Sequence, residues 1–293
     1  MSRSFHRSRM RNAAHSMALL GLIATTTWAD ESLDMQRAAL LEQSKMIANE
    51  TGVSFVDGGD DRKLALVQKP AFRYDDQPRR IVDATLWVWT YQGRPVAFEK
   101  LEALDRGGGV SEWQHCFASL AEERLRAKWK DRKFESTEAG VSFTAIPDAI
   151  VPARRTSERR RQLRDLARAF GARIQPQAQN KDSQEMRLLA TPVFEYDDAD
   201  KLLEGAVFGY STNGTNPDLL IVFEARSVRG KLVWHYAPAR MTIGGILVKY
   251  QEKSVWESPA VDPGRNTFET WTYFQTRRDV PAATKPRDPA EQK

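Results

Sequence analysis

The sequence predicts an α+β fold of two homologous units, each a helix followed by a small antiparallel sheet, packed as a pseudo-dimer. The first observation is an internal repeat, in which the segment 70–76 returns at 192–198 with five of seven residues identical. The second is that further matches follow in the same order. The third is that each copy begins with a helical pattern and continues as apolar runs joined by short turns, which favours antiparallel pairing. The further matches are Asp83-Ala84 with Glu204-Gly205, Phe98-Glu99 with Phe223-Glu224, and Trp113 with Trp234.

Hydrophobic spacing indicates the elements of the first unit. Apolar residues at a loose helical spacing predict a helix over 31–51, and Gly52 is its expected stop. Runs rich in β-branched and aromatic residues predict the strands, and the run 81–91 is the strongest of them. The strands of this unit are expected at 64–67, 81–91, 96–101, 113–120 and 141–146.

The second unit repeats this pattern. Its helix is expected over 157–170, and Gly171 is its stop. The segment 147–157, with two prolines, is the expected linker, and the tail 276–293, rich in proline and charge, is predicted to be disordered. The strands are expected at 186–189, 205–210, 219–225, 232–236, 246–250 and 270–274. The resulting parts are a leader (1–29), a first repeat (30–150), a second repeat (151–275) and the tail (276–293).

The first 29 residues have the pattern of a secretory signal peptide. Four arginines precede a short apolar run at 17–24, and small residues precede the expected cleavage after Ala29. The run is far shorter than the ~20 residues of a membrane-spanning helix, and no transmembrane segment is expected in the mature chain. We therefore expect an exported, soluble protein, either periplasmic or secreted.

The charge of the chain argues against a nucleic-acid partner. The formal net charge is +5, but the four arginines of the leader account for most of it. Without the leader, 40 basic side chains face 39 acidic ones. A nearly neutral protein has no overall field to attract DNA or RNA.

The sequence contains no recognisable catalytic or metal-binding motif. Cys116 is the only cysteine, and its apolar neighbours indicate a buried, inert thiol. The expected mature chain has two histidines, His115 and His235, and neither belongs to a cluster with zinc-ligand spacing. The sequence has no Gly-x-Ser-x-Gly elbow and no phosphate-binding glycine loop. We therefore predict no cofactor, no metal and no catalytic residue, which leans against an enzyme.

Four residues are candidates for ligand binding because they recur in the two copies. Tyr74 and Tyr196 each precede a pair of aspartates, and these pairs are typical of turns. Glu99 and Glu224 each end an apolar run, and a pseudo-two-fold axis would bring them together. A glutamate at a strand end is more often paired with arginine or exposed to water.

Three functions are compatible with these patterns. The leading one is a non-catalytic binding or scaffold protein whose small-molecule ligand lies between the two repeats. The second is a hydrolase that uses Glu99 and Glu224 as acid and base. The third is a structural envelope component that docks on an anionic surface through the second helix, where Arg160, Arg164 and Arg168 share one face.

The chain also resembles exported bacterial proteins of unknown function that have a duplicated layout. The resemblance implies an exported location and a repeated architecture, and it implies no chemistry. The residues that carry it are the two Tyr-Asp-Asp triplets and the segments 83–87, 93–97, 213–217 and 239–242.

Overall fold

The computed structural model describes residues 34–57, 62–107, 111–175, 182–198, 203–262 and 270–277. The expected signal peptide, and the expected tail beyond residue 277, lie outside these residues. The chain divides into two compact units, one of residues 43–280 and the other of residues 1–42 with 281–293. The site described below lies wholly within the unit 43–280. Across the described residues, no helix combines the length and the apolar composition needed to cross a membrane.

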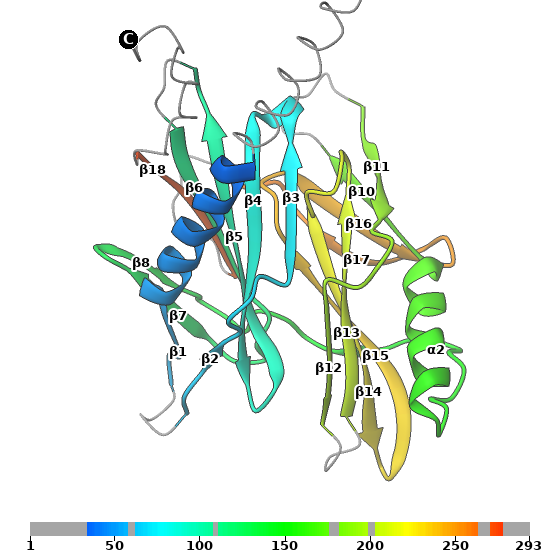
Figure 1. Cartoon of the computed structure of the whole chain (residues 1–293). Helices are drawn as coiled ribbons and strands as arrows, with labels where there is room; N and C mark the ends of the chain where they lie inside the picture. The colour runs from blue at the N-terminus through cyan, green and yellow to red at the C-terminus, as the bar shows by residue number, and fades with distance from the viewer. Residues whose placement is uncertain are drawn as a thin grey trace, which may run out of the picture. The chain divides into compact units, whose positions relative to one another are not determined.

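The prediction of an α+β fold of two helix-plus-sheet units is wrong, because strands dominate the chain (Figure 1). The described residues form two α-helices, at 34–50 and at α2 (Thr156–Ala169), and eighteen strands in three sheets, one of which curls into a half-barrel. Several strands come from segments without a predicted element. In β7 (Leu125–Trp129), for example, buried and exposed residues alternate, as expected for a strand with one buried face.

The first sheet has six strands in the order β18-β6-β5-β4-β2, and β3 also pairs with β4. The predicted strand 81–91 is confirmed residue for residue as β4. The aspartate pairs at 75–76 and 197–198, predicted to lie in turns, are instead the last residues of two strands. The strands of this sheet are β2 (Ala65–Leu66), β3 (Phe72–Asp76), β4 (Ile81–Tyr91), β5 (Arg94–Asp105), β6 (Ser111–Ser119) and β18 (Trp271–Arg277).

The second sheet has nine strands in the order β17-β16-β10-β11-β13-β14-β15-β9, and β12 also pairs with β13. Its strands are β9 (Thr144–Ala145), β10 (Phe170–Gln175), β11 (Gln184–Leu188), β12 (Phe194–Asp198), β13 (Leu203–Ser211), β14 (Leu219–Val228), β15 (Lys231–Arg240), β16 (Gly245–Tyr250) and β17 (Lys253–Ser258). The third sheet has three strands, β1 (Gly52–Phe55), β7 and β8 (Arg132–Glu135).

The two large sheets exchange edge strands. β9 precedes the expected boundary at residue 150 but pairs with β15 of the second sheet. β18 comes from the far end of the described chain but pairs with β6 of the first sheet. Each large sheet therefore includes an edge strand from the other half of the sequence. Two self-contained units would not exchange strands in this way.

The strand pairing nevertheless follows the same order in both sheets. β3, β4, β5 and β6 pair successively, as do β12, β13, β14 and β15. The registers establish which residues correspond. Across the first sheet, Tyr74 lies opposite Ala84, which lies opposite Glu102. Across the second sheet the same positions are occupied by Tyr196, Gly205 and Glu224.

This register corrects one match made from the sequence. Glu224 corresponds to Glu102 and not to Glu99, which lies opposite Trp87 and Phe117. Neighbouring residues of a strand point to opposite faces, and Glu99 is an odd number of residues from Glu102. Glu99 therefore projects from the other face of β5.

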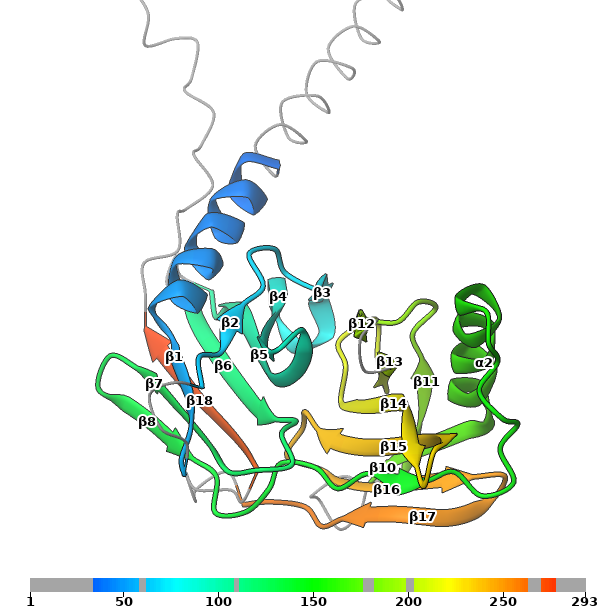
Figure 2. The same ribbon diagram turned by 90° about the horizontal axis from the view of Figure 1, so that it is seen from below.

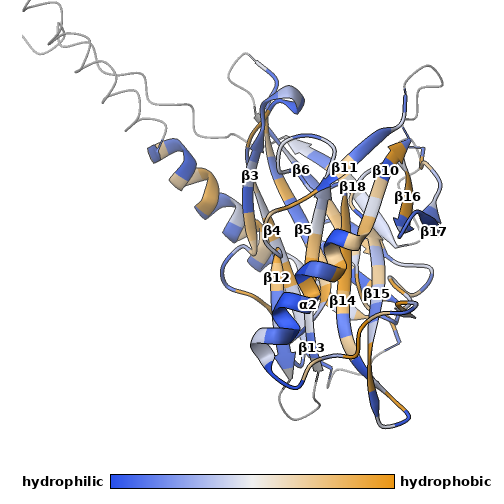
Figure 3. Cartoon of the chain, turned by 90° about the vertical axis from the view of Figure 1, so that its right-hand side faces the viewer, coloured by the Kyte–Doolittle hydropathy of each residue, from blue (hydrophilic) through white to orange (hydrophobic). Residues whose placement is uncertain are grey.

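One core lies between the two large sheets, whose central strands occupy opposite sides in two views (Figures 1 and 2). One cluster of buried side chains combines Leu86, Val88 and Phe98 of the first sheet with Val207 and Val222 of the second. Figure 3 shows hydrophobic residues concentrated in the strands, whereas α2 is largely hydrophilic.

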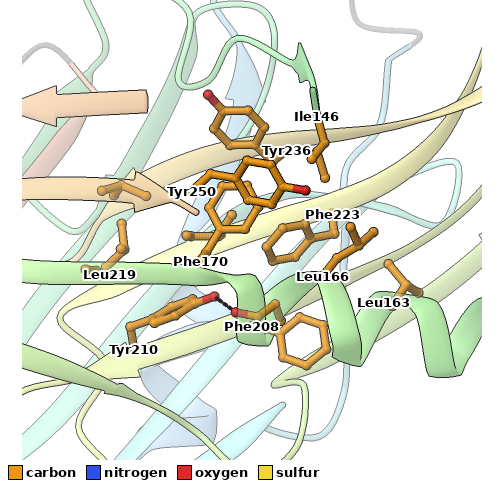
Figure 4. Close-up of a cluster of buried hydrophobic side chains, with 14 of the residues drawn as sticks. Ile146, Leu163, Leu166, Phe170, Phe208, Tyr210, Leu219, Phe223, Tyr236 and Tyr250 are labelled. Atoms are coloured by element: carbon orange, nitrogen blue, oxygen red, sulfur yellow. Dashed lines mark hydrogen bonds between the residues drawn. The ribbon is translucent and has the colours of Figure 1, made fainter. Parts of the chain in front are cut away.

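A second core lies on the face of β13, β14 and β15 that points away from the first sheet. It is covered by α2 and by strands β10, β16 and β17 of the same curled sheet. Phe170 is at its centre, with ring centroids 4.8–5.1 Å from those of Phe223, Tyr236 and Tyr250 (Figure 4). The Tyr210 hydroxyl donates a hydrogen bond to the Ala167 carbonyl of α2 at 2.7 Å. The central strands β13 and β14 are therefore packed on both faces, and the connection between them contributes Asn216 and Asp218 to one wall of the site.

Candidate functional site

A polar cavity of about 380 Å³ lies between the two large sheets. Its floor is formed by the first sheet, and one wall by the connection between β13 and β14. An apolar wall completes it. The floor residues include Lys100, Glu102, Gln114 and Cys116, the connection contributes Asn216 and Asp218, the apolar wall includes Met241, Ile243 and Trp271, and Arg79 and Arg106 also line the cavity.

Glu102 is the centre of the floor. Its side chain is buried, and it accepts hydrogen bonds from the Tyr74 hydroxyl at 2.7 Å and from Gln114 Nε2 at 2.5 Å. Lys100, two residues earlier on β5, points to the same face and places its ammonium nitrogen 3.7 Å from Glu102 Oε1. Gln114 in turn accepts a hydrogen bond from Gln275 of β18 at 2.9 Å. The floor is therefore a connected network of polar groups from four strands.

Lys100 connects this floor to the second sheet. Its side chain is 3% exposed, and its ammonium donates to Asn216 Oδ1 at 3.0 Å and to the Pro217 carbonyl at 3.1 Å. Asn216 donates through Nδ2 to Asp76 Oδ2 of β3 at 3.3 Å. Two charged side chains of the first sheet, Lys100 and Asp76, thus contact the connection between β13 and β14 of the second sheet through Asn216.

Arg79 and Asp218 form a second link between the sheets at the cavity wall. Arg79 Nη1 lies 3.2 Å from Asp218 Oδ1, and Arg79 Nε lies 3.4 Å from Asp76 Oδ2. The other oxygen of Asp218 accepts from the backbone nitrogen and the hydroxyl of Thr212, at 2.8 and 2.7 Å. Burial lowers the pKa of Arg79, but Asp218 and Asp76 outweigh that effect and raise it, so the guanidinium stays charged.

Two further groups near the floor remain protonated. Burial, followed by the adjacent Glu102, raises the pKa of the Tyr74 hydroxyl well above its ordinary value. Burial likewise raises the pKa of the Cys116 thiol. Tyr74 is therefore a hydrogen-bond donor to Glu102, and Cys116 is a neutral thiol with little nucleophilic character.

The second sheet has a corresponding arrangement at its own glutamate. Glu224 is fully buried, and Arg94 of β5 donates to its Oε2 at 2.7 Å. Arg94 and Arg226 both lie over the ring of Phe143, 4.8 and 4.5 Å from its centroid, and both also bond to Glu122. Burial raises the pKa of Glu224, although Arg94 acts in the opposite direction.

The structure brings together some of the predicted site residues and separates others. Tyr74 contacts the cavity floor through Glu102, and Tyr196 and Glu224 belong to the corresponding arrangement. Glu99 lies on the opposite face of β5, where it pairs with His115 Nδ1 at 2.9 Å. Glu99 and Glu224 are therefore in different layers and are not placed to act on one substrate.

The three arginines predicted to contact an anionic surface lie on α2. Arg164 is exposed, Arg168 is 67% exposed, and Arg160 is half-exposed. Arg168 pairs with Asp165 at 3.1 Å, and Arg160 lies 3.9 Å from Glu204. Nearby carboxylates therefore partly neutralise this face.

Sequence reasoning missed most of the cavity residues. Lys100 and Glu102 lie in a strand whose other residues are mainly apolar, and charges at both positions of an i, i+2 pair in such a strand indicate that one face of the strand is polar. This signal was available in the sequence. Asn216 and Asp218 had no such signal, because residues of these types around a proline are also typical of a plain turn.

The fold and the cavity together define a strand-rich protein with a polar, ligand-sized site between two facing sheets. No protein-family model matches the chain, and neither a curated protein nor a solved structure matches it. Among the described residues, no group of three or more His, Cys, Asp or Glu side chains is placed to hold a metal ion.

Proposed function

We propose that this protein binds a small molecule in the cavity between its two large sheets, and that it does so without catalysis, as an exported protein. The observation that supports the proposal is the buried ionic network on the cavity floor. Lys100 and Glu102 of the floor and Asp218 of the adjoining wall are each at most 3% exposed, and the contacts of Lys100 and Asp218 join the two sheets.

The energetic cost of this network supports a binding role. Removing a charged side chain from water costs several kcal/mol, and well-packed apolar residues in its place are often neutral or stabilising. A purely structural sheet interface would therefore gain little from such charges. A volume of about 380 Å³ is within the ~300–1,000 Å³ typical of small-molecule sites. Polar groups at fixed positions beside an apolar wall are suited to orient one ligand.

The chemistry of the lining favours binding over reaction. The thiol of Cys116 and the hydroxyl of Tyr74 retain their protons, and the carboxylate of Glu102 is occupied by two hydrogen-bond donors. These groups hold a ligand in place more readily than they attack it.

The test is to identify molecules that accompany the purified protein and to fill the cavity. Mass spectrometry of the molecules released when the purified protein is denatured is expected to show a small molecule that was bound to the native chain. Ile243→Trp, in the cavity wall, is expected to abolish its retention, whereas Val228→Trp, at an exposed site on β14, is expected to leave it unchanged. Equal retention by both variants, or a native protein that carries nothing and is stabilised by no compound, would contradict the proposal.

The exposed arginines of α2 favour a second candidate role, which is docking on an anionic envelope surface. Arg164 and Arg168 project to solvent on a helix whose buried residues Leu163, Leu166 and Ala167 already pack on the second sheet. The exposed arginines can therefore contact a partner without disturbing the core.

A further inference from the structure

The second sheet contains a filled counterpart of the cavity. Glu224 corresponds to Glu102, and a guanidinium from the same chain occupies the space beside it. Arg94 Nη2 lies 2.7 Å from Glu224 Oε2, and the Arg94 Cζ atom is 4.8 Å from the centroid of Phe143. At this end of the sheet interface, a planar cation therefore lies between a buried carboxylate and an aromatic ring.

At the other end, the residue that corresponds to Arg94 is an asparagine. Arg94 precedes Pro95 at the start of β5, and Asn216 precedes Pro217 just before β14. The separation between Arg94 and Asn216 is 122 residues, the same as between Glu102 and Glu224. Asn216 is too short to reproduce the arginine contact, and its side chain bonds to Lys100 and Asp76 instead. The cavity thus lies where the counterpart has a guanidinium.

The balance of charges around Glu224 and around Glu102 also indicates that the cavity lacks a cation that its counterpart has. Near Glu224, two arginines (Arg94 and Arg226) face two glutamates, Glu122 and Glu224. At the cavity, Lys100 and Arg79 face three buried carboxylates, and the rim pair of Arg106 with Glu112 adds no net charge. The three carboxylates belong to Asp76, Glu102 and Asp218. Counted over the described residues, the cavity cluster therefore carries one excess formal negative charge, which is costly in a buried site unless a cation joins it.

The hydrogen bonds indicate the same preference. Each cation that lines the cavity already has a carboxylate partner: Arg79 has Asp218, Lys100 has Glu102, and Arg106 has Glu112. An anionic ligand would have to compete for these cations. A carboxylate accepts up to about four hydrogen bonds, so a ligand that brings N–H donors can add to the bonds Glu102 already accepts.

We infer that the ligand of this cavity carries a guanidinium or ammonium group that approaches Glu102, joined to a short apolar body that packs on Met241, Ile243 and Trp271. The indole of Trp271 suits a cation as well as an apolar chain. This inference rests on the proposed binding function and specifies its ligand class.

Calorimetry with four matched probes tests the ligand class. The probes are n-butylguanidinium, n-butylammonium, n-butyramide and butyrate, each titrated into the purified protein. The two cations are expected to bind at least about tenfold more tightly than the amide and the carboxylate. Glu102→Gln is expected to remove this preference, whereas Glu112→Gln, in the rim pair with Arg106, is expected to change cation affinity less than about twofold.

Two variants keep the test decisive if Glu102→Gln does not fold. Asn216→Arg places in the cavity the side chain that the counterpart already has, and it is expected to abolish n-butylguanidinium binding. If butyrate or butyramide binds as tightly as the cations, and Ile243→Trp abolishes that binding, the cationic class is wrong while the binding site stands. If no probe binds and the purified protein carries no ligand, the proposed function and the ligand class both fail.

Discussion

The hydroxyl of Tyr74 reaches across strand β4 and donates a 2.7 Å hydrogen bond to Glu102 on β5. Tyr196 and Glu224 have the same relationship of register in the second sheet. Between each tyrosine and its glutamate lies a small residue, Ala84 in one sheet and Gly205 in the other. The repeated acidic-then-small dipeptide in the sequence therefore marks the strand that each tyrosine must cross.

Loss of the Tyr74 hydroxyl is expected to destabilise the protein. Tyr74→Phe removes a donor from a buried carboxylate, and the expected loss in free energy of unfolding is about 1–3 kcal/mol. Urea denaturation measures it. Tyr236→Phe is the matched control, because its hydroxyl bonds a neutral backbone carbonyl at the longer distance of 3.2 Å. A loss no larger than that of the control would show that the Tyr74–Glu102 bond contributes little.

A second prediction concerns Gly205. A Cβ added there would lie 2.3 Å from Cζ of the Tyr196 ring, whereas one added at Gly171 of β10 would meet no atom within 4 Å. Gly205→Ala is therefore expected to cost about 1–3 kcal/mol of folding free energy through overpacking. Gly171→Ala is expected to be close to neutral. If thermal denaturation shows equal effects for both, the Tyr196 ring moves without cost and the close approach is not a constraint.

The sequence pattern predicts individual strands, but it does not predict that strands far outnumber helices. Strand β4 was predictable because eleven successive residues favour a buried strand. Strands β7 and β10 have exposed residues at nearly every second position, the period of a half-buried strand, but each segment is too short for this period to be distinctive in the sequence. The α+β prediction followed from recognising both helices while missing such strands.

The site was only partly predictable, because it depends on registers and on long-range contacts. The local identity of Phe98-Glu99 with Phe223-Glu224 suggested the wrong equivalence, and pairing irregularities near both ends of the β4–β5 ladder are invisible in the sequence. The contact between Lys100 and Asn216 joins residues 116 positions apart, and no local pattern predicts it. The tyrosines were predictable because they recur within segments that share five of seven residues.

Among the side chains that join the two sheets, Lys100 is expected to contribute most to the free energy of unfolding. Lys100→Met leaves the buried carboxylate of Glu102 and the amide of Asn216 without their cation, at a cost of about 3–5 kcal/mol. The double variant with Glu102→Gln is expected to lose less than the sum of the single losses. Lys249→Met, which removes a surface pair with Glu252, is the control and is expected to cost at most about 1 kcal/mol. Strict additivity in chemical denaturation would mean that Lys100 and Glu102 do not interact.

The second candidate role makes its own prediction. If α2 docks on an anionic surface, Arg160→Glu with Arg164→Glu is expected to reduce co-sedimentation with phosphatidylglycerol vesicles several-fold at low salt. Arg132→Glu with Arg229→Glu changes the net charge equally at exposed sites elsewhere. Equal binding by the two double variants would assign any vesicle affinity to overall charge and remove the docking role.

The last prediction concerns pH and the buried carboxyl of Glu224. Burial raises its pKa above the ordinary 4.5, so between the two values the folded chain binds more protons than the unfolded chain. The contribution of Glu224 to stability is therefore largest at low pH and is lost as the pH rises through the folded-state pKa. The difference in free energy of unfolding between the native protein and Glu224→Gln is expected to fall from about pH 4 to about pH 8.

Glu123 provides a control of opposite sign. Its hydrogen bond with Arg62 lowers its pKa, so its contribution is present above the unfolded-state pKa and is lost as the pH falls. The corresponding difference for Glu123→Gln is expected to rise with pH over the same range, and urea denaturation at a series of pH values measures both. If the difference for Glu224→Gln also rises with pH, Arg94 lowers the pKa of Glu224 by more than burial raises it. The contact between Arg94 and Glu224, the internal analogue of the proposed ligand contact, is then stronger than the burial of Glu224 implies.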